Sequence, residues 1–198
     1  MELTLKQKIK TIIKLINEPS VLRILLSFRM NGYLFEMGWF NSFKLKEPLD
    51  KNLKPIPWVT YSFIDFIIER LKSDFIICEF GSGNSTLFYA EKVKKIYAVE
   101  DNYVWYQRIK EKLPENAEII YENSKGKNEY ALAPVKINSK FHIIIIDGTD
   151  RVNCIKASIN CLNEFGVIIL DDSERVEYDE GISFLLAEGF KKLDFWGV

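Results

Sequence analysis

Hydrophobic residues in the C-terminal three quarters of the chain fall into short, nearly continuous apolar runs separated by stretches of helical periodicity. The apolar runs lie at residues 75–80, 95–100, 117–122, 141–147 and 166–172. Helical spacing occupies residues 61–71, 84–93, 102–113, 149–163 and 176–188. Continuous apolar strands that alternate with helices are typical of a parallel sheet covered on both faces. We therefore predict an α/β fold with a doubly wound, mostly parallel sheet.

The first 54 residues follow a different pattern. Apolar residues recur at helical spacing from Leu5 to Ile16 and lie opposite several lysines, and a second apolar stretch runs from Val21 to Leu26. An irregular aromatic segment at 32–43 follows, and two prolines within residues 54–60 then hold the backbone extended. The pattern predicts an N-terminal helical arm, residues 1–54, and a main domain, residues 55–198.

The charge of the chain is nearly balanced, with 27 Lys and Arg against 28 Asp and Glu. The balance gives no sign of a nucleic-acid partner. The arm is nevertheless basic, and such a helix suits peripheral contact with an anionic membrane, packing on the main domain or self-association. Three cysteines without paired spacing, and lysines where a signal peptide needs apolar residues, indicate a cytoplasmic protein, peripheral at the membrane if the arm binds there.

Acidic residues close nearly every predicted strand. They are Glu79, Glu100, Asp101, Asp147, Asp171 and Asp172. Ligands of open parallel sheets bind beyond the carboxyl ends of the strands, so these acids are expected at one edge with the turn Gly81-Ser82-Gly83. A glycine turn before a helix lets a ligand approach free backbone N–H groups.

The details of this turn favour one cofactor. Thr86 stands where the dinucleotide fingerprint has a third small residue, which argues against NAD. Glu79 suits a ligand that carries positive charge, and Glu100 can accept hydrogen bonds from both hydroxyls of a ribose. Adenosine joined to a cationic group is S-adenosylmethionine, which we predict as the cofactor.

The motifs E-F-G-S-G-N-S-T (79–86), Y-A-V-E (97–100), I-I-I-I-D-G (143–148) and L-D-D (170–172) resemble those of class I S-adenosylmethionine-dependent methyltransferases. Residues 55–198 carry the resemblance, and the sequences around the turn and after the last two strands are similar to a small bacterial group of uncertain substrate. The resemblance implies a Rossmann-like methyltransferase fold. It implies that Glu79, Gly81 and Gly83 contact the methionine part of the cofactor, Glu100 the ribose and residues 121–123 the adenine. The full set of candidate cofactor-binding residues is Glu79, Gly81, Ser82, Gly83, Asn84, Ser85, Thr86, Glu100, Asp101, Glu122, Asn123 and Asp147.

The C-terminal residues depart from this family. A class I sheet has seven strands, whereas residues 191–198 are predicted to form the sixth strand and no seventh follows. The expectation is either a truncated product or a sheet completed by a partner or by the N-terminal arm.

Methyl transfer to a hydroxyl requires alignment and a base. His142 opens the strand that Asp147 closes, so it lies at the wrong edge of the sheet. We therefore expect Asp147, Asp172 and Arg151 to carry catalysis. Either the acids bind Mg²⁺, as in catechol-type O-methyltransferases, or Arg151 and Arg175 neutralise them through i,i+4 and i,i+3 spacings. The arginines favour the second arrangement, and no metal site is predicted.

The leading hypothesis is a methyltransferase that acts on an oxygen of a small molecule or sugar. The alternatives are a nucleotide-binding oxidoreductase and a catalytically idle methyltransferase-like module that binds a partner through the arm. Thr86 in the third position of the fingerprint and the lack of a histidine at the carboxyl ends of the strands stand against the oxidoreductase.

Overall fold

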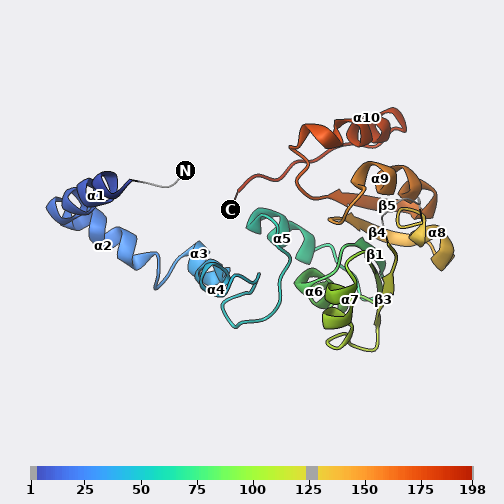
Figure 1. The fold of residues 1–198 in the computed structure, drawn as a ribbon, viewed down its shortest axis with the longest axis horizontal. Helices are drawn as coiled ribbons and strands as arrows, with labels where there is room; N and C mark the ends of the chain where they lie inside the picture. The colour runs from blue at the N-terminus through green and yellow to red at the C-terminus, as the bar shows by residue number, and fades with distance from the viewer. Residues whose placement is uncertain (1–3, 124–128, 198) are drawn as a thin grey trace. The chain divides into compact units, whose positions relative to one another are not determined.

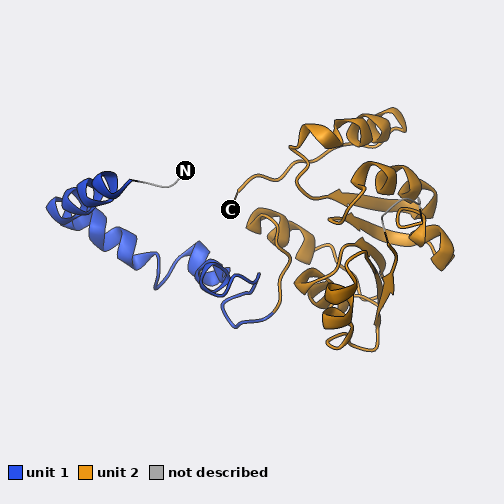
Figure 2. Ribbon diagram, viewed as in Figure 1, with its two compact units in different colours: residues 1–54 blue, residues 55–198 orange. Residues whose placement is uncertain are grey.

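The computed structural model describes residues 4–123 and 129–197. The chain separates into two compact units, residues 1–54 and 55–198 (Figure 2). Each unit is described below by itself.

Unit 1 is mostly helical from Leu5 to Leu45, and residues 46–54 contain no helix. Its helices are α1 (Leu5–Asn17), α2 (Pro19–Ser27), α3 (Tyr33–Glu36) and α4 (Trp39–Leu45). The prediction of an irregular aromatic segment at 32–43 was wrong, because most of that segment lies in α3 and α4. Gly32 and Gly38 precede these helices with φ of 98° and 83°, a conformation that glycine adopts readily. The backbone turns at these two glycines and enters two short helices, which the spacing of hydrophobic residues did not predict.

Unit 2 is built on a five-stranded sheet. The strands are β1 (Ile76–Phe80), β2 (Lys95–Glu100), β3 (Ala117–Tyr121), β4 (Phe141–Ile146) and β5 (Leu162–Leu170), in the order β3-β2-β1-β4-β5 with every pairing parallel. The chain winds outward from β1 to β3 and then returns to the other side of β1 (Figure 1). The doubly wound parallel sheet is thus confirmed, and its order reverses between β1 and β4, where such sheets bind ligands.

Helices cover both faces of this sheet. They are α5 (Tyr61–Ile68), α6 (Asn84–Ala90), α7 (Tyr103–Lys110), α8 (Ala133–Ile137), α9 (Arg151–Ser158) and α10 (Asp179–Ala187), with 3-10 turns at Ile159–Cys161 and Val176–Tyr178. One core cluster packs Phe80 and Ile144 of the sheet against Ile155 of α9. A separate cluster packs Ala98 and Ile119 against Ile109 of α7. Adjacent strand residues face opposite sides, so the nearly all-apolar strands supply both cores.

The C-terminal segment is not the predicted sixth strand. Residues 191–197 form no strand, and the ring of Phe195 instead lies 5.3 Å from that of Phe63 and 4.8 Å from that of Phe66, both on α5. The Ser62 hydroxyl also donates to the carbonyl of Trp196 over 3.2 Å. Packing against α5 therefore replaces pairing with the edge of the sheet.

Two predicted boundaries also shift. The helix expected over 149–163 ends at Ser158, and β5 starts at Leu162, four residues before the predicted strand. The register between β4 and β5 changes between Phe141 and Ile143, which marks an irregular start to that pairing.

The three cysteines are buried free thiols. Within the described residues no helix has both the length and the apolar character needed to cross a membrane.

Candidate functional site

The glycine turn follows β1 and lies between the ends of β2 and β4. Gly81 has a φ of 93°, and its N–H donates to the carbonyl of Val99 on β2 over 2.8 Å. A Cβ at Gly81 would approach the carbonyl oxygen of Asp147 to 3.2 Å. Both the backbone conformation and the close approach to the segment after β4 therefore favour glycine at this position.

Glu79 and Thr86 support the turn from below. The Thr86 hydroxyl donates to the Glu79 carboxylate and accepts the Gly83 N–H over 3.0 Å. Glu79 is 1% exposed and Thr86 is fully buried. Thr86 was expected among the cofactor-binding residues, and its hydrogen bonds and burial give this departure from the dinucleotide fingerprint a structural role. Burial raises the pKa of Glu79 to about 7, even though hydrogen bonds from Ser85 and Thr86 act in the opposite direction.

Glu100 at the end of β2 is joined to the same turn. Its carboxylate accepts the Ser82 hydroxyl over 2.6 Å and the Asn102 N–H over 2.9 Å. The indole N–H of Trp105 on α7 donates to the Ser82 carbonyl over 2.7 Å. The structure therefore brings Ser82 and Glu100 together as the sequence predicted. The bond from Trp105 was not predicted, because no local spacing connects this indole to a turn 23 residues earlier.

The remaining predicted residues of this edge lie after β2 and β3. Asp101 accepts the Thr149 hydroxyl over 3.0 Å, which links the segments that follow β2 and β4. Glu122 donates its backbone N–H to the Glu100 carbonyl over 3.0 Å, but its carboxylate forms an ion pair with Lys136 over 2.7 Å. Glu122 is therefore beside the predicted ribose-binding residue, with its side chain held by a lysine. Asn123 follows it, and Asn84 and Ser85 begin α6.

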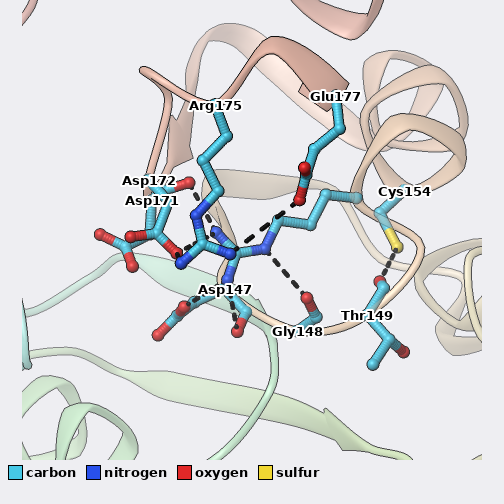
Figure 3. Close-up of polar contacts among 9 residues, drawn as sticks. Asp147, Gly148, Thr149, Cys154, Asp171, Asp172, Arg175 and Glu177 are labelled. Atoms are coloured by element: carbon cyan, nitrogen blue, oxygen red, sulfur yellow. Dashed lines mark hydrogen bonds and ion pairs between the residues drawn. The ribbon is translucent and has the colours of Figure 1, made fainter.

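Arg151 at the start of α9 connects the ends of β4 and β5. It donates to the carbonyl of Gly148 over 3.0 Å and to that of Asp171 over 2.6 Å. It also lies 3.1 Å from a carboxylate oxygen of Asp147 and 3.4 Å from one of Asp172 (Figure 3). Its side chain is only 9% exposed. A planar guanidinium suits this role, since its five N–H groups point at several acceptors at once.

The Asp147 carboxyl faces a second acid. Burial and the nearby charge of Asp171 raise the pKa of Asp147 to about 8, whereas Arg151 acts to lower it. Burial also raises the pKa of Asp171, whose side chain forms a hydrogen bond with that of Asp147. The pair therefore holds a proton in the neutral range, which gives Asp147 a pKa suited to proton transfer near neutral pH.

Arg175 completes the charge balance at the end of β5. It lies 2.7 Å from the Asp172 carboxylate (Figure 3). Both ion pairs predicted from i,i+4 and i,i+3 spacing are thus present. In the described ranges no group of three or more His, Cys, Asp or Glu side chains has an arrangement that could hold a metal ion. Guanidinium groups lie among these carboxylates.

His142 lies at the opposite end of β4, as expected. Its Nδ1 accepts the Ile76 N–H over 3.0 Å, and its ring stacks on that of Phe75 with centroids 4.5 Å apart. It therefore lies at the amino end of β4, at the opposite edge of the sheet from the acids.

Two residues that fix the site were missed by sequence reasoning. Tyr130 is buried under the turn, and its hydroxyl donates to the Val99 carbonyl over 3.3 Å. A Cβ at Gly148 would stand 2.0 Å from that hydroxyl and 2.9 Å from the Gly81 nitrogen. The glycine that ends the motif I-I-I-I-D-G (143–148) was the only local signal, because Tyr130 reaches the turn through tertiary packing alone.

Comparison with solved structures identifies similar folds. A methyltransferase-like protein from Silicibacter pomeroyi matches with a TM-score of 0.57 and 20% identity, over 66% of this chain and 81% of that chain. A protein described as precorrin 8w decarboxylase from Methanobacterium thermoautotrophicum matches with a TM-score of 0.55 and 18% identity, over 69% and 75%. Precorrin-6y C5,15-methyltransferase from Geobacter metallireducens matches with a TM-score of 0.53 and 18% identity, over 65% and 71%.

Comparison by sequence adds nothing to this list, since no family model and no curated protein matches the chain. The expected fold is nevertheless confirmed by the sheet order, the turn after β1 and the structural neighbours together. The main domain has the class I S-adenosylmethionine-dependent methyltransferase fold.

Proposed function

We propose that the chain is an S-adenosylmethionine-dependent methyltransferase whose cofactor binds over the turn at residues 81–83. The observation that carries the proposal is the contact between the turn and Glu100, made by the 2.6 Å hydrogen bond from Ser82. A carboxylate accepts about four hydrogen bonds, so Glu100 can accept ribose hydroxyls beside or in place of the Ser82 hydroxyl. The ribose would then lie between the ends of β1 and β2.

Gly83 supports the same position for the cofactor. Its φ of 167° is extended backbone that any residue adopts, and a Cβ there would meet no atom within 4 Å. Neither conformation nor internal packing thus requires a glycine. A ligand that lies directly on the backbone accounts for it, because such a ligand would occupy the space of a side chain.

The buried acid below the turn suits the charge of this cofactor. Glu79 lies beneath the glycines, and its pKa of about 7 means that it is about half ionised at neutral pH and ionised in alkaline solution. Since it is 1% exposed, it would act through the electric field of its charge and by holding Thr86, without touching the ligand. The methionine part of the cofactor, with its sulfonium and ammonium groups, is favoured there over a pyrophosphate.

The acids after β4 and β5 would form the acceptor side. Bound S-adenosylmethionine supplies an electrophilic methyl group, which an acceptor oxygen attacks while the carbon–sulfur bond breaks and a neutral thioether leaves. Asp147 is placed to take the proton of the acceptor hydroxyl, and its raised pKa makes it a stronger base than an ordinary aspartate. Arg151 holds Asp147 and Asp172 in place, and is a positioning residue.

The charge of this edge favours a hydroxyl-bearing small molecule or sugar as acceptor. Four carboxylates lie there, on Asp101, Asp147, Asp171 and Asp172, against the two guanidinium groups of Arg151 and Arg175. Carboxylates accept hydrogen bonds from hydroxyls, and the excess of negative charge disfavours a polyphosphate backbone.

A thermal shift experiment tests the cofactor. S-adenosylhomocysteine, at about 100 times its dissociation constant, should stabilise the chain by about 2.7 kcal/mol. For a protein of this size that corresponds to a rise in Tm of roughly 5 to 10 °C. NAD at the same concentration should give no rise. A rise with NAD alone would favour the oxidoreductase, and no rise with either ligand would contradict the proposed function.

A further inference from the structure

One face of α1 is apolar and exposed in unit 1. It consists of Leu5, Ile9, Ile12, Ile13 and Ile16, whose exposed fractions run from 50% to 74%. Leu15, on the side of the helix, is the one apolar residue of α1 that is half-buried. A row of large apolar side chains along 13 residues is far more than the scattered exposed residues of an ordinary surface.

Lysines border this face on both sides. At 100° per residue, Lys6 lies beside Ile13 at one border and Lys8 lies beside Ile12 at the other, while Lys10 and Lys14 occupy the opposite face. Long lysine side chains at such borders extend their ammonium groups away from apolar surroundings toward water or anions.

Acidic residues are almost absent from this pair of helices. Residues 4–29 contain six Lys or Arg and one acid, Glu18, whereas residues 55–198 contain more acids than bases. A second copy packed in parallel on this face would bring the lysines of the two α1 helices together, which is repulsive. A surface that combines hydrocarbon with a layer of negative charge complements both features of α1 at once.

We propose that α1 binds an anionic lipid bilayer, with its axis in the plane of the membrane and its apolar face among the acyl chains. A helix of 13 residues is about 20 Å long, shorter than the roughly 30 Å of a hydrocarbon core, so it lies in the interface. Lys6 and Lys8 then meet the headgroups. Membrane binding would hold the main domain near acceptors that are themselves at the bilayer.

Flotation of the full chain with lipid vesicles tests the proposal. The protein should float with vesicles of equal parts phosphatidylcholine and phosphatidylglycerol, float little with phosphatidylcholine alone, and be released partly by added salt. The variant I12E/I16E should bind the anionic vesicles at least about a hundredfold more weakly, since each of the two buried isoleucines contributes roughly a factor of ten or more.

A matched variant separates lost apolar contact from added charge. Q7E/T11E introduces the same two charges on the polar face, and Glu at position 7 preserves the capping box with Thr4. I12S/I16S removes the apolar groups without adding charge. The proposal predicts weak binding for I12S/I16S and a smaller loss for Q7E/T11E. Equal binding by all variants, or no binding to anionic vesicles together with a dimer in sedimentation that I12S/I16S abolishes, would overturn it.

Discussion

Replacement of Arg151 by alanine should destabilise unit 2 much more than replacement of Arg175. Arg151 is 9% exposed, donates to three carbonyls and to the Asp147 carboxylate, and forms an ion pair with the Asp172 carboxylate, all from the segments that follow β4 and β5. Arg175 is 50% exposed and pairs with the Asp172 carboxylate, with a longer 4.0 Å approach to Glu177. The two arginines therefore share an acid but differ in burial.

The magnitude follows from this difference. Removal of one partner from a buried charge network costs about 3 to 5 kcal/mol. Because the side chains of Asp147 and Asp172 are 40% and 29% exposed, water screens the carboxylates that remain. The lower end, about 3 kcal/mol, is thus expected for Arg151→Ala. An exposed ion pair contributes about 0 to 1 kcal/mol, which is the expected cost of Arg175→Ala.

Urea unfolding of the wild type and both variants measures this difference, with Arg151→Lys as a further comparison. Lysine retains the charge but not the planar fork, so it should recover only part of the lost free energy of unfolding. Losses within about 0.5 kcal/mol of each other for Arg151→Ala and Arg175→Ala would refute the assignment of Arg151 as the residue that joins the two strand ends.

Three further predictions concern the same edge. Gly148→Ala should lower the free energy of unfolding by roughly 1 to 3 kcal/mol, because its Cβ would overlap the Tyr130 hydroxyl, and Tyr130→Phe in the same chain should recover part of the loss in urea unfolding. Methyl transfer to a hydroxyl acceptor should increase as pH rises through about 8, because Asp147 accepts a proton only when ionised, and Asp147→Asn should remove both the rate and this pH dependence in a steady-state assay. Glu100→Ala should weaken S-adenosylhomocysteine binding in calorimetry by roughly 1 to 3 kcal/mol, whereas Glu118→Ala, an exposed acid on β3, should leave it unchanged.

The parts of the fold that the sequence predicted correctly are those with strong local signals. The runs that became β1, β2, β3 and β4 are nearly all apolar, and each ends at an acid that the parallel sheet carries to a common edge. The pairing of Arg151 with Asp147 was predicted from their spacing, although the turn between β4 and α9, with Asp150 at a φ of 51°, and not a helix brings the two side chains together. Residue identity and periodicity suffice in such cases, because neighbours in sequence are also neighbours in space.

The features that were missed depend on contacts between distant segments. The apolar residues of 191–197 alternate as in a strand, but Phe195 gains ring contacts with α5 that no local pattern reports. Helical spacing places Trp105 in the helix predicted over 102–113, but it does not show that the indole N–H donates to the Ser82 carbonyl. Thr86 was interpreted as a ligand contact because it lies in the motif, although its burial gives it an internal role.

A crystal structure of the full chain with S-adenosylhomocysteine tests the central claim most directly. The account predicts that the ribose hydroxyls lie within hydrogen-bond distance of Glu100, that the methionine part lies on the backbone of Gly81 and Gly83, and that the sulfur points toward Asp147. A ligand bound away from the ends of β1 and β2, or one whose ribose does not contact Glu100, would contradict it.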